Sequence, residues 1–126
     1  MISSDQRTAY LAGATEPLLY KVDLETMTWI RGPENPIRIN DLSGDALHHA
    51  TMDERGIVYV TSFNEDALYL FDSTCDEKLA GPIDLGQSST LLEGPHGIAI
   101  HGSGDRWQGY FAMSLSNVLG FVEFFW

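Results

Sequence analysis

The sequence predicts an all-β protein built from consecutive four-stranded antiparallel sheets, each encoded by about 50 residues. Two observations lead to this prediction. Short segments rich in Val, Ile, Tyr and Phe alternate with turn-forming residues, which is typical of strands. Several of these segments also recur at a nearly constant spacing. No stretch has the sustained i, i+3, i+4, i+7 apolar pattern of an amphipathic helix.

Four markers define the repeat. A tyrosine-centred segment recurs with its tyrosines, Tyr10, Tyr59 and Tyr110, spaced by 49 and 51 residues. A second segment follows each of these at a constant offset, at 19–23, 68–72 and 119–123. Gly32-Pro33 recurs as Gly81-Pro82 after 49 residues, and the segment beginning at His48 recurs from His96 after 48 residues. Four markers that share one spacing indicate a genuine repeat.

Each repeat is expected to hold four strands, A to D, numbered from the innermost outwards. The expected A strands are 47–53 and 96–101, and the expected B strands are 8–14, 56–63 and 107–114. The expected C strands are 18–24, 67–73 and 117–125, and the expected D strands are 28–33 and 77–85. A period near 50 with four short antiparallel strands is typical of a β-propeller blade.

The strand order therefore reads BCD-ABCD-ABC, an incomplete ring within one chain. We expect one domain over 1–126, with a partial blade at about 1–40, a complete blade at 41–90 and a partial blade at 91–126. Segments 56–64, 68–74 and 94–99 resemble the YVTN/NHL type of propeller repeat. That repeat runs as a G-x-x-YVT strand, an apolar strand ending in Asp, and a P-x-G-I-A inner strand. The resemblance implies a partial propeller of about two and a half blades.

An incomplete propeller leaves surfaces that need a partner. Closed propellers typically have four to eight blades, and the apolar segment 118–126 would end the last blade without a neighbour. Exposed patches of this kind mark interfaces. Two interpretations stay open: a homo-oligomer joined through the open blade edges, or a fragment of a longer propeller protein. A homodimer is the simplest symmetric form of the first.

Composition excludes several partners. Seven Lys and Arg against eighteen Asp and Glu give a net charge of −11, and no basic cluster offsets it. Nucleic acid and anionic membrane surfaces are therefore not expected partners. No apolar run reaches the length of a transmembrane helix, and the N-terminus lacks the pattern of a secretory signal, which leaves the compartment unknown. A single cysteine, Cys75, excludes an intrachain disulfide.

The histidines are the leading candidate site. His48 and His96 hold equivalent positions at the start of the expected inner strands, and His49 follows His48. Imidazoles converging on a propeller channel can hold copper or another divalent metal. The alternative is that they cap the inner strands or bind channel water, with no cofactor.

Two narrower resemblances bear on these histidines. Segment 45–49, with Asp53, Gly56, Tyr59, Thr61 and Phe63, is similar to inner-strand motifs of nitrous oxide reductase propellers. That likeness implies copper ligation, although Ala50 replaces the usual proline and the cupredoxin domain is absent. Segment 95–99 resembles streptogramin-lyase-like and gluconolactonase-like propellers. It implies acids at the channel mouth, for which the candidates are Asp41, Asp45 and Glu93; the alternative is that these are turn residues.

The other singled-out residues favour structural roles. The three repeat-locked tyrosines are expected to pack between blades, and Asp23 and Asp72 to cap turns. Trp29, Trp107 and Trp126 lie outside the repeat pattern, and one of them could line a sugar-binding groove between blades. No set of residues forms a nucleophilic triad, and none is assigned as catalytic.

Two functions remain. The favoured one is a non-catalytic propeller repeat module for assembly or ligand binding. The alternative is a metal-dependent propeller enzyme, an oxidoreductase or a lyase, with His48, His49 and His96 at its channel. The identity of any small-molecule ligand is not predicted.

Overall fold

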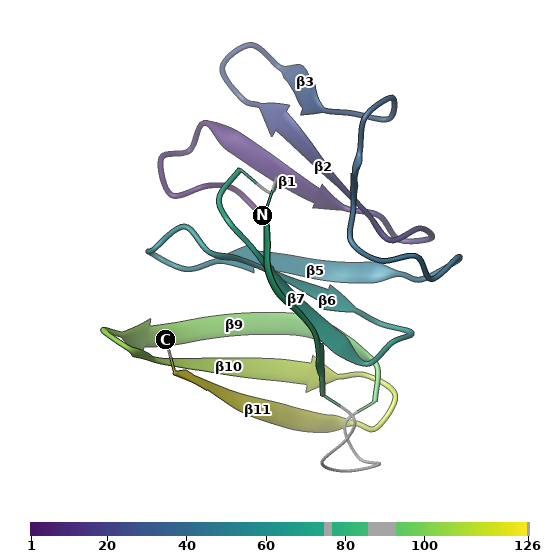
Figure 1. Cartoon of the computed structure of the whole chain (residues 1–126), viewed down its shortest axis with the longest axis vertical. Helices are drawn as coiled ribbons and strands as arrows, with labels where there is room; N and C mark the ends of the chain where they lie inside the picture. The colour runs from purple at the N-terminus through teal and green to yellow at the C-terminus, as the bar shows by residue number, and fades with distance from the viewer. Residues whose placement is uncertain (75–76, 86–92, 126) are drawn as a thin grey trace.

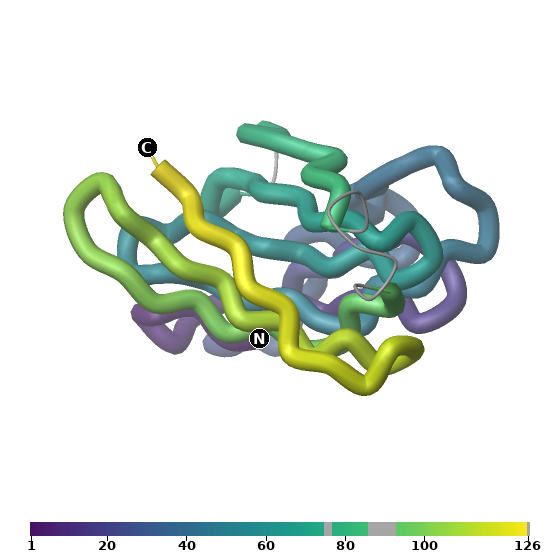
Figure 2. Tube along the Cα trace, turned by 90° about the horizontal axis from the view of Figure 1, so that it is seen from below, coloured from purple at the N-terminus to yellow at the C-terminus, as the bar shows by residue number. Residues whose placement is uncertain are grey.

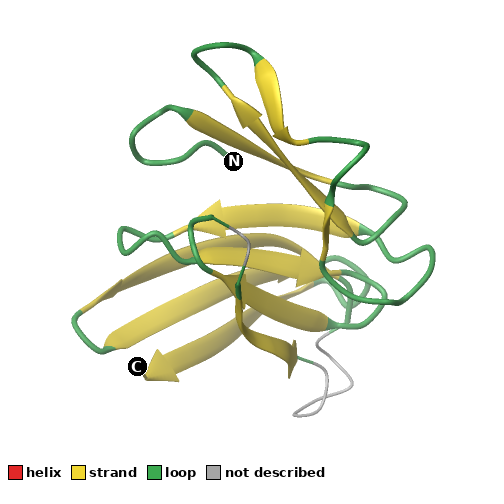
Figure 3. Ribbon diagram, turned by 45° about the horizontal axis from the view of Figure 1, so that its top comes forward, coloured by secondary structure: helices red, strands yellow, loops and turns green. Residues whose placement is uncertain are grey.

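The computed structural model describes residues 1–74, 77–85 and 93–125. The described residues form eleven strands and no helix, arranged in three antiparallel sheets (Figure 1, Figure 3). The prediction of an all-β antiparallel fold is confirmed. No described segment forms a helix of the length and apolarity that would cross a membrane. Cys75 and Trp126 lie outside the described residues.

The first sheet contains β1 (Thr8–Ala12), β2 (Leu18–Asp23), β3 (Thr28–Arg31) and β4 (Ile37–Arg38). β2 lies at its centre, with β1 on one edge and both β3 and β4 on the other. Lys21 pairs with Arg31, whereas Leu19 pairs with Ile37. β3 and β4 are thus two pieces of one outer strand, and the sequence did not predict the second piece.

The second sheet has the order β5-β6-β7-β8, from β5 (Leu47–Met52), β6 (Val58–Ser62), β7 (Ala67–Phe71) and β8 (Lys78–Asp84). Every residue of β6 and β7 is buried. Successive side chains of a strand point to opposite faces, so both faces of this sheet are covered. That explains why both strands read as nearly unbroken apolar runs rather than as alternating patterns.

The repeated Gly-Pro marker lies where the outer strand of a sheet loses its register. In the second sheet, Leu70 pairs with Ala80 and Leu68 with Ile83, and Gly81-Pro82 lies between. Gly81 has a φ of 121°, and a Cβ there would lie 2.6 Å from the Tyr69 ring. Only glycine fits this position. In the first sheet, Gly32-Pro33 begins the loop that separates β3 from β4.

The third sheet has the order β11-β10-β9, from β9 (Pro95–Ser103), β10 (Arg106–Met113) and β11 (Val118–Phe125). Its buried face sets aromatic rings against glycines. A Cβ on Gly109 would lie 2.9 Å from the Phe111 ring, and one on Gly102 would lie 2.8 Å from the Trp107 ring. The glycines therefore make room for the rings.

The three sheets stack, with the second between the other two (Figure 1, Figure 2). One core joins the first and second sheets, and its members include Tyr10, Leu19, Val60 and Tyr69. The other joins the second and third sheets, and its members include Tyr59, Leu68, Trp107 and Phe111. Among the described residues, no layer covers the outward faces of the first and third sheets, and both faces carry exposed apolar side chains.

Candidate functional site

A β-bulge in β5 positions the histidine pair. Leu47 pairs with Ser62 and Ala50 pairs with Val60, so two residues, His48 and His49, stand opposite one. A bulge of this kind interrupts the normal alternation of side chains. Leu47 and Ala50 both enter the core shared with the first sheet, whereas both histidines contact β9 of the third sheet.

The bulge brings the histidines to the seam between β5 and β9. The His48 ring stacks on the His96 ring, with centroids 4.3 Å apart and planes inclined by 29°. The Phe63 ring also contacts His48, in an edge-to-face arrangement with centroids 4.6 Å apart. The expected proximity of His48 and His96 is therefore present.

His49 takes a different role at the same seam. Its Nδ1 accepts a hydrogen bond of 3.2 Å from the backbone N–H of Ile98. Ile98 lies on β9, whose other edge pairs with β10, so His49 satisfies a donor on the free edge of β9. Thr61 closes the bulge: its Oγ1 accepts from the His49 N–H and donates to the His49 carbonyl, both at 3.2 Å.

This arrangement accounts for the histidines without a metal. Imidazole lone pairs lie in the ring plane, so stacked rings do not aim two nitrogens at one point between them. His49 already uses Nδ1 as an acceptor. Within residues 1–74, 77–85 and 93–125, no group of three or more His, Cys, Asp and Glu side chains is placed to hold a metal ion. Ligation by His48, His49 and His96 stays a prediction.

Surroundings disfavour the charged form of two of these histidines. Partial burial lowers the pKa of His48, and His96 lowers it further while Asp45 opposes the change. Partial burial, the Met1 ammonium group and His96 together lower the pKa of His49. Both imidazoles are therefore held neutral, as the acceptor role of His49 requires.

Acidification should weaken the seam between the second and third sheets. Because the folded-state pKa values are lowered, the unfolded chain takes up protons first as the pH falls below about 6.5. The stabilisation is complete above that pH and declines below it. We expect urea unfolding to give a smaller free energy at about pH 5.5 than at about pH 7.5, and the His49→Gln variant to show a smaller difference.

The matched control is His101→Gln, which removes an exposed histidine near the other end of β9. It should keep the wild-type pH dependence. An unchanged pH dependence in His49→Gln would show that the Ile98 N–H does not depend on a neutral imidazole.

Asp45, a candidate acid at the channel mouth, is buried with an exposed fraction of 0%. Its carboxylate accepts from Ser62 Oγ at 2.5 Å, from Asn40 Nδ2 at 2.8 Å and from the Asn64 N–H at 2.9 Å. Asp45 thus fastens the loop before β5 to the turn after β6. Asp41 and Glu93 are exposed in loops.

A second buried network was not predicted from the sequence. The Asp53 carboxylate accepts from the Arg55 guanidinium at 2.7 Å, from Tyr59 OH at 2.9 Å and from the backbone N–H groups of Arg55 and Ile57. The Arg55 guanidinium lies 3.9 Å from the centroid of the Trp107 ring. Burial and the Asp53 carboxylate raise the pKa of Tyr59 well above its usual value. The Asp-x-Arg sequence in the tight turn between β5 and β6 is the signal that could have predicted this network.

Two of the singled-out tryptophans lie in different environments. Trp107 is 3% exposed in the core between the second and third sheets, and its Nε1 donates to the Gly104 carbonyl. Trp29 is 53% exposed on β3 and lies beside Tyr20, with ring centroids 6.0 Å apart. A groove lined by Trp107 would require the core to open, whereas Trp29 is already accessible.

The turn aspartates behave as the sequence predicts. Asp23 Oδ1 accepts from the N–H groups of Glu25 and Thr26, both at 2.9 Å, and these bonds lower the pKa of Asp23. Asp72 accepts from Thr74 Oγ1 and from the Glu77 N–H. Both carboxylates shape the turn that follows their strand.

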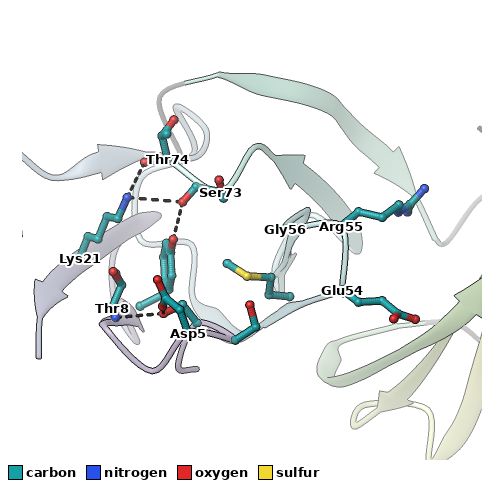
Figure 4. Close-up of a pocket in the computed structure, with 12 residues that line it drawn as sticks. Asp5, Thr8, Lys21, Glu54, Arg55, Gly56, Ser73 and Thr74 are labelled. Carbon is teal, nitrogen blue, oxygen red and sulfur yellow. Dashed lines mark hydrogen bonds between the residues drawn. The ribbon is translucent and has the colours of Figure 1, made fainter.

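A cavity of about 420 Å³ opens where the first and second sheets meet (Figure 4). Several of its polar groups are engaged with the protein. Lys21 Nζ donates to the carbonyls of Ser73 and Thr74 at 3.4 and 3.3 Å, and Tyr10 OH donates to the Ser73 carbonyl. Asp5 accepts from Ser3 Oγ, a bond that lowers the pKa of Asp5. These contacts join the two sheets.

Three sets of contacts thus hold neighbouring sheets together. The histidine seam and the Asp53 network join the second sheet to the third, and the Lys21 contacts join the first to the second. Comparison of the chain with models of protein families, with curated proteins and with solved structures found no match in any of the three.

Proposed function

We propose that this chain is a non-catalytic β-propeller repeat module of the YVTN/NHL type, which acts by assembling with further blades. The repeat of four markers supports the proposal, as do the sheet orders β1-β2-β3, β5-β6-β7-β8 and β11-β10-β9. In this proposal each sheet is one blade, and β5 and β9 are inner strands.

One observation carries the proposal. Leu19, Leu68 and Leu119 hold equivalent positions in the repeat. Leu19 and Leu68 are each 0% exposed, because a following sheet covers them, whereas Leu119 is 72% exposed. A side chain that the repeat buries twice and leaves open once indicates that a further sheet covers it in the functional state.

The chemistry of the candidate residues favours assembly over catalysis. His49 accepts from a backbone donor, His48 stacks on His96 and contacts Phe63 edge to face, and Asp45 is buried among its own partners. A general base must reach the substrate proton, and a metal site needs several converging ligands. These three side chains instead hold strands and loops of the protein together.

Radical footprinting of the purified chain at two concentrations tests the proposal. We expect Leu119 and Phe121 to be oxidised strongly in dilute protein and weakly in concentrated protein, because assembly covers them. Met27, 73% exposed in the β2–β3 turn, is the internal control and should react equally in both samples. Equal oxidation of Leu119 and Phe121 at both concentrations would contradict the proposal.

A further inference from the structure

The sheets of this chain pack in one direction. We name the face that a sheet turns toward the next sheet along the chain its forward face. In the first sheet this face includes Tyr10 and Leu19, and in the second it includes Tyr59 and Leu68. These four side chains are 3% exposed or less.

The forward face of the third sheet has the same pattern and no cover. Tyr110 and Leu119 are the repeat equivalents of the buried pairs, and Phe121 lies opposite Tyr110 in the register of β10 and β11. Their exposed fractions are 38% for Tyr110, 72% for Leu119 and 48% for Phe121. Ala99 completes the cross-strand row with Tyr110 and Phe121.

The opposite face, the backward face, repeats as well. In the second sheet it consists of side chains packed against the first sheet: Val58, Val60, Ala67, Tyr69 and Phe71. Their equivalents in the first sheet point outward: Ala9, Leu11, Leu18, Tyr20 and Val22. One position shows the contrast. Val60 and its third-sheet equivalent Phe111 are 0% and 1% exposed, whereas Leu11 is 45% exposed.

The two open faces are therefore the two halves of a contact that the chain already makes twice. A forward face meets a backward face between the first and second sheets, and again between the second and third. No forward face meets another forward face among the described residues. Building on the proposed function, we infer that the forward face of the third sheet docks on the backward face of the first sheet of a second copy of this chain.

Charge supports a second copy as the partner. Each chain carries a net charge of −11, so two copies repel wherever their charged surfaces approach. Among their strand residues, the open forward face carries Arg106 and Glu123, and the open backward face carries Arg38, which pairs with Leu18. No acidic side chain of one face therefore meets an acidic side chain of the other.

The three sheets formed by the described residues bear on the size of the assembly. Closed propellers have about four to eight blades. Two chains of three sheets supply six, whereas three chains would supply nine. A head-to-tail contact closes a ring when the rotation permits and otherwise propagates as a filament. The inference is therefore a closed dimer with two identical head-to-tail junctions.

A mixing experiment with two charge variants tests this arrangement. Leu119→Glu spoils the open forward face and Leu11→Arg spoils the open backward face. Each variant alone should be a monomer by light scattering after gel filtration, because every junction would contain one added buried charge. Mixed in equal amounts, they should form a dimer with one native junction and one Glu–Arg junction. Leu79→Glu and Met27→Arg, at exposed positions outside both faces, are the matched controls and should dimerise as the wild type does.

The outcomes of the mixing experiment separate a failure of the proposed function from a failure of head-to-tail docking. A monomeric wild type would overturn the proposed function together with this inference. A dimeric wild type in which only one variant disrupts, or in which the mixture stays monomeric, would overturn head-to-tail docking and leave assembly standing. Circular dichroism confirms that each variant is folded. If one is not, Phe121→Glu and Tyr20→Arg repeat the test on the same faces.

Discussion

Replacing Asp53 by Ala is expected to lower the free energy of unfolding by about 1–3 kcal/mol, the usual cost of leaving a buried hydrogen-bonding group without its partner. The Asp53 side chain is 0% exposed and accepts from Arg55, from Tyr59 OH and from two backbone donors of its turn. Its removal leaves the Tyr59 hydroxyl buried without this acceptor and frees the Arg55 guanidinium from its position over Trp107. Urea unfolding of the variant measures the effect.

The neighbouring Glu54→Ala variant is the control for the Asp53 prediction. Glu54 is exposed in the same turn, so the change should alter the free energy of unfolding by no more than about 0.5 kcal/mol. Equal effects of the two substitutions would mean that the Asp53 network contributes nothing specific to the contact between the second and third sheets.

Leu68→Ala is expected to lower the free energy of unfolding by about 2–5 kcal/mol, because it opens a cavity in a core that surrounds the side chain completely. Leu68 is 0% exposed and packs between the second and third sheets. Unfolding should be compared at one protein concentration, since assembly makes apparent stability depend on concentration.

Leu42→Ala is the control for the Leu68 prediction. Leu42 is 43% exposed in the loop before β5, and its truncation should change the free energy of unfolding by no more than about 0.5 kcal/mol. A loss at Leu68 as small as the loss at Leu42 would show that the third sheet does not cover the second.

Much of the strand layout could be predicted from residue spacing. Tyr10, Tyr59 and Tyr110 lie within β1, β6 and β10, because strands that repeat keep equivalent residues in equivalent elements. The two-residue strand β4 could not be predicted in the same way. It lies beyond the Gly32-Pro33 break, and its pairing with β2 depends on how the intervening loop folds back.

The histidine seam could be predicted in part. The repeat placed His48 and His96 at equivalent positions, and their rings do stack. The role of His49 depends on the bulge opposite Thr61. Ordinary alternation would send His49 to the face opposite His48, away from β9. A bulge is a property of the pairing between two strands, so the sequence of 47–52 alone does not predict it.

Burial of polar residues was the least predictable feature. Asp45 and Asp53 read as turn acids in a chain with eighteen acidic residues, yet their exposed fractions are 0% and 6%. The partners that make such burial tolerable come from elsewhere in the chain: Ser62 and Asn64 for Asp45, and Tyr59 for Asp53. Only the assembled turns bring these groups within hydrogen-bonding distance.

The proposed function rests on two repeat positions that are exposed, Leu11 and Leu119. Leu11 and Leu119 carry apolar side chains like their buried equivalents, but no sheet among the described residues covers them. The alternation of apolar residues along each strand would by itself place Leu11 and Leu119 in a core. The proposal of a partner rests on this contrast: the same repeat position is buried in one sheet and exposed in another.

A native mass spectrum of the wild-type protein tests the central claim, that the open faces of the first and third sheets are covered by assembly. We expect a discrete species of twice the 14.0 kDa chain mass, which gives way to the single chain on dilution. A species of 14.0 kDa at every concentration would contradict it, because the three sheets would then be stable with both end faces open to water.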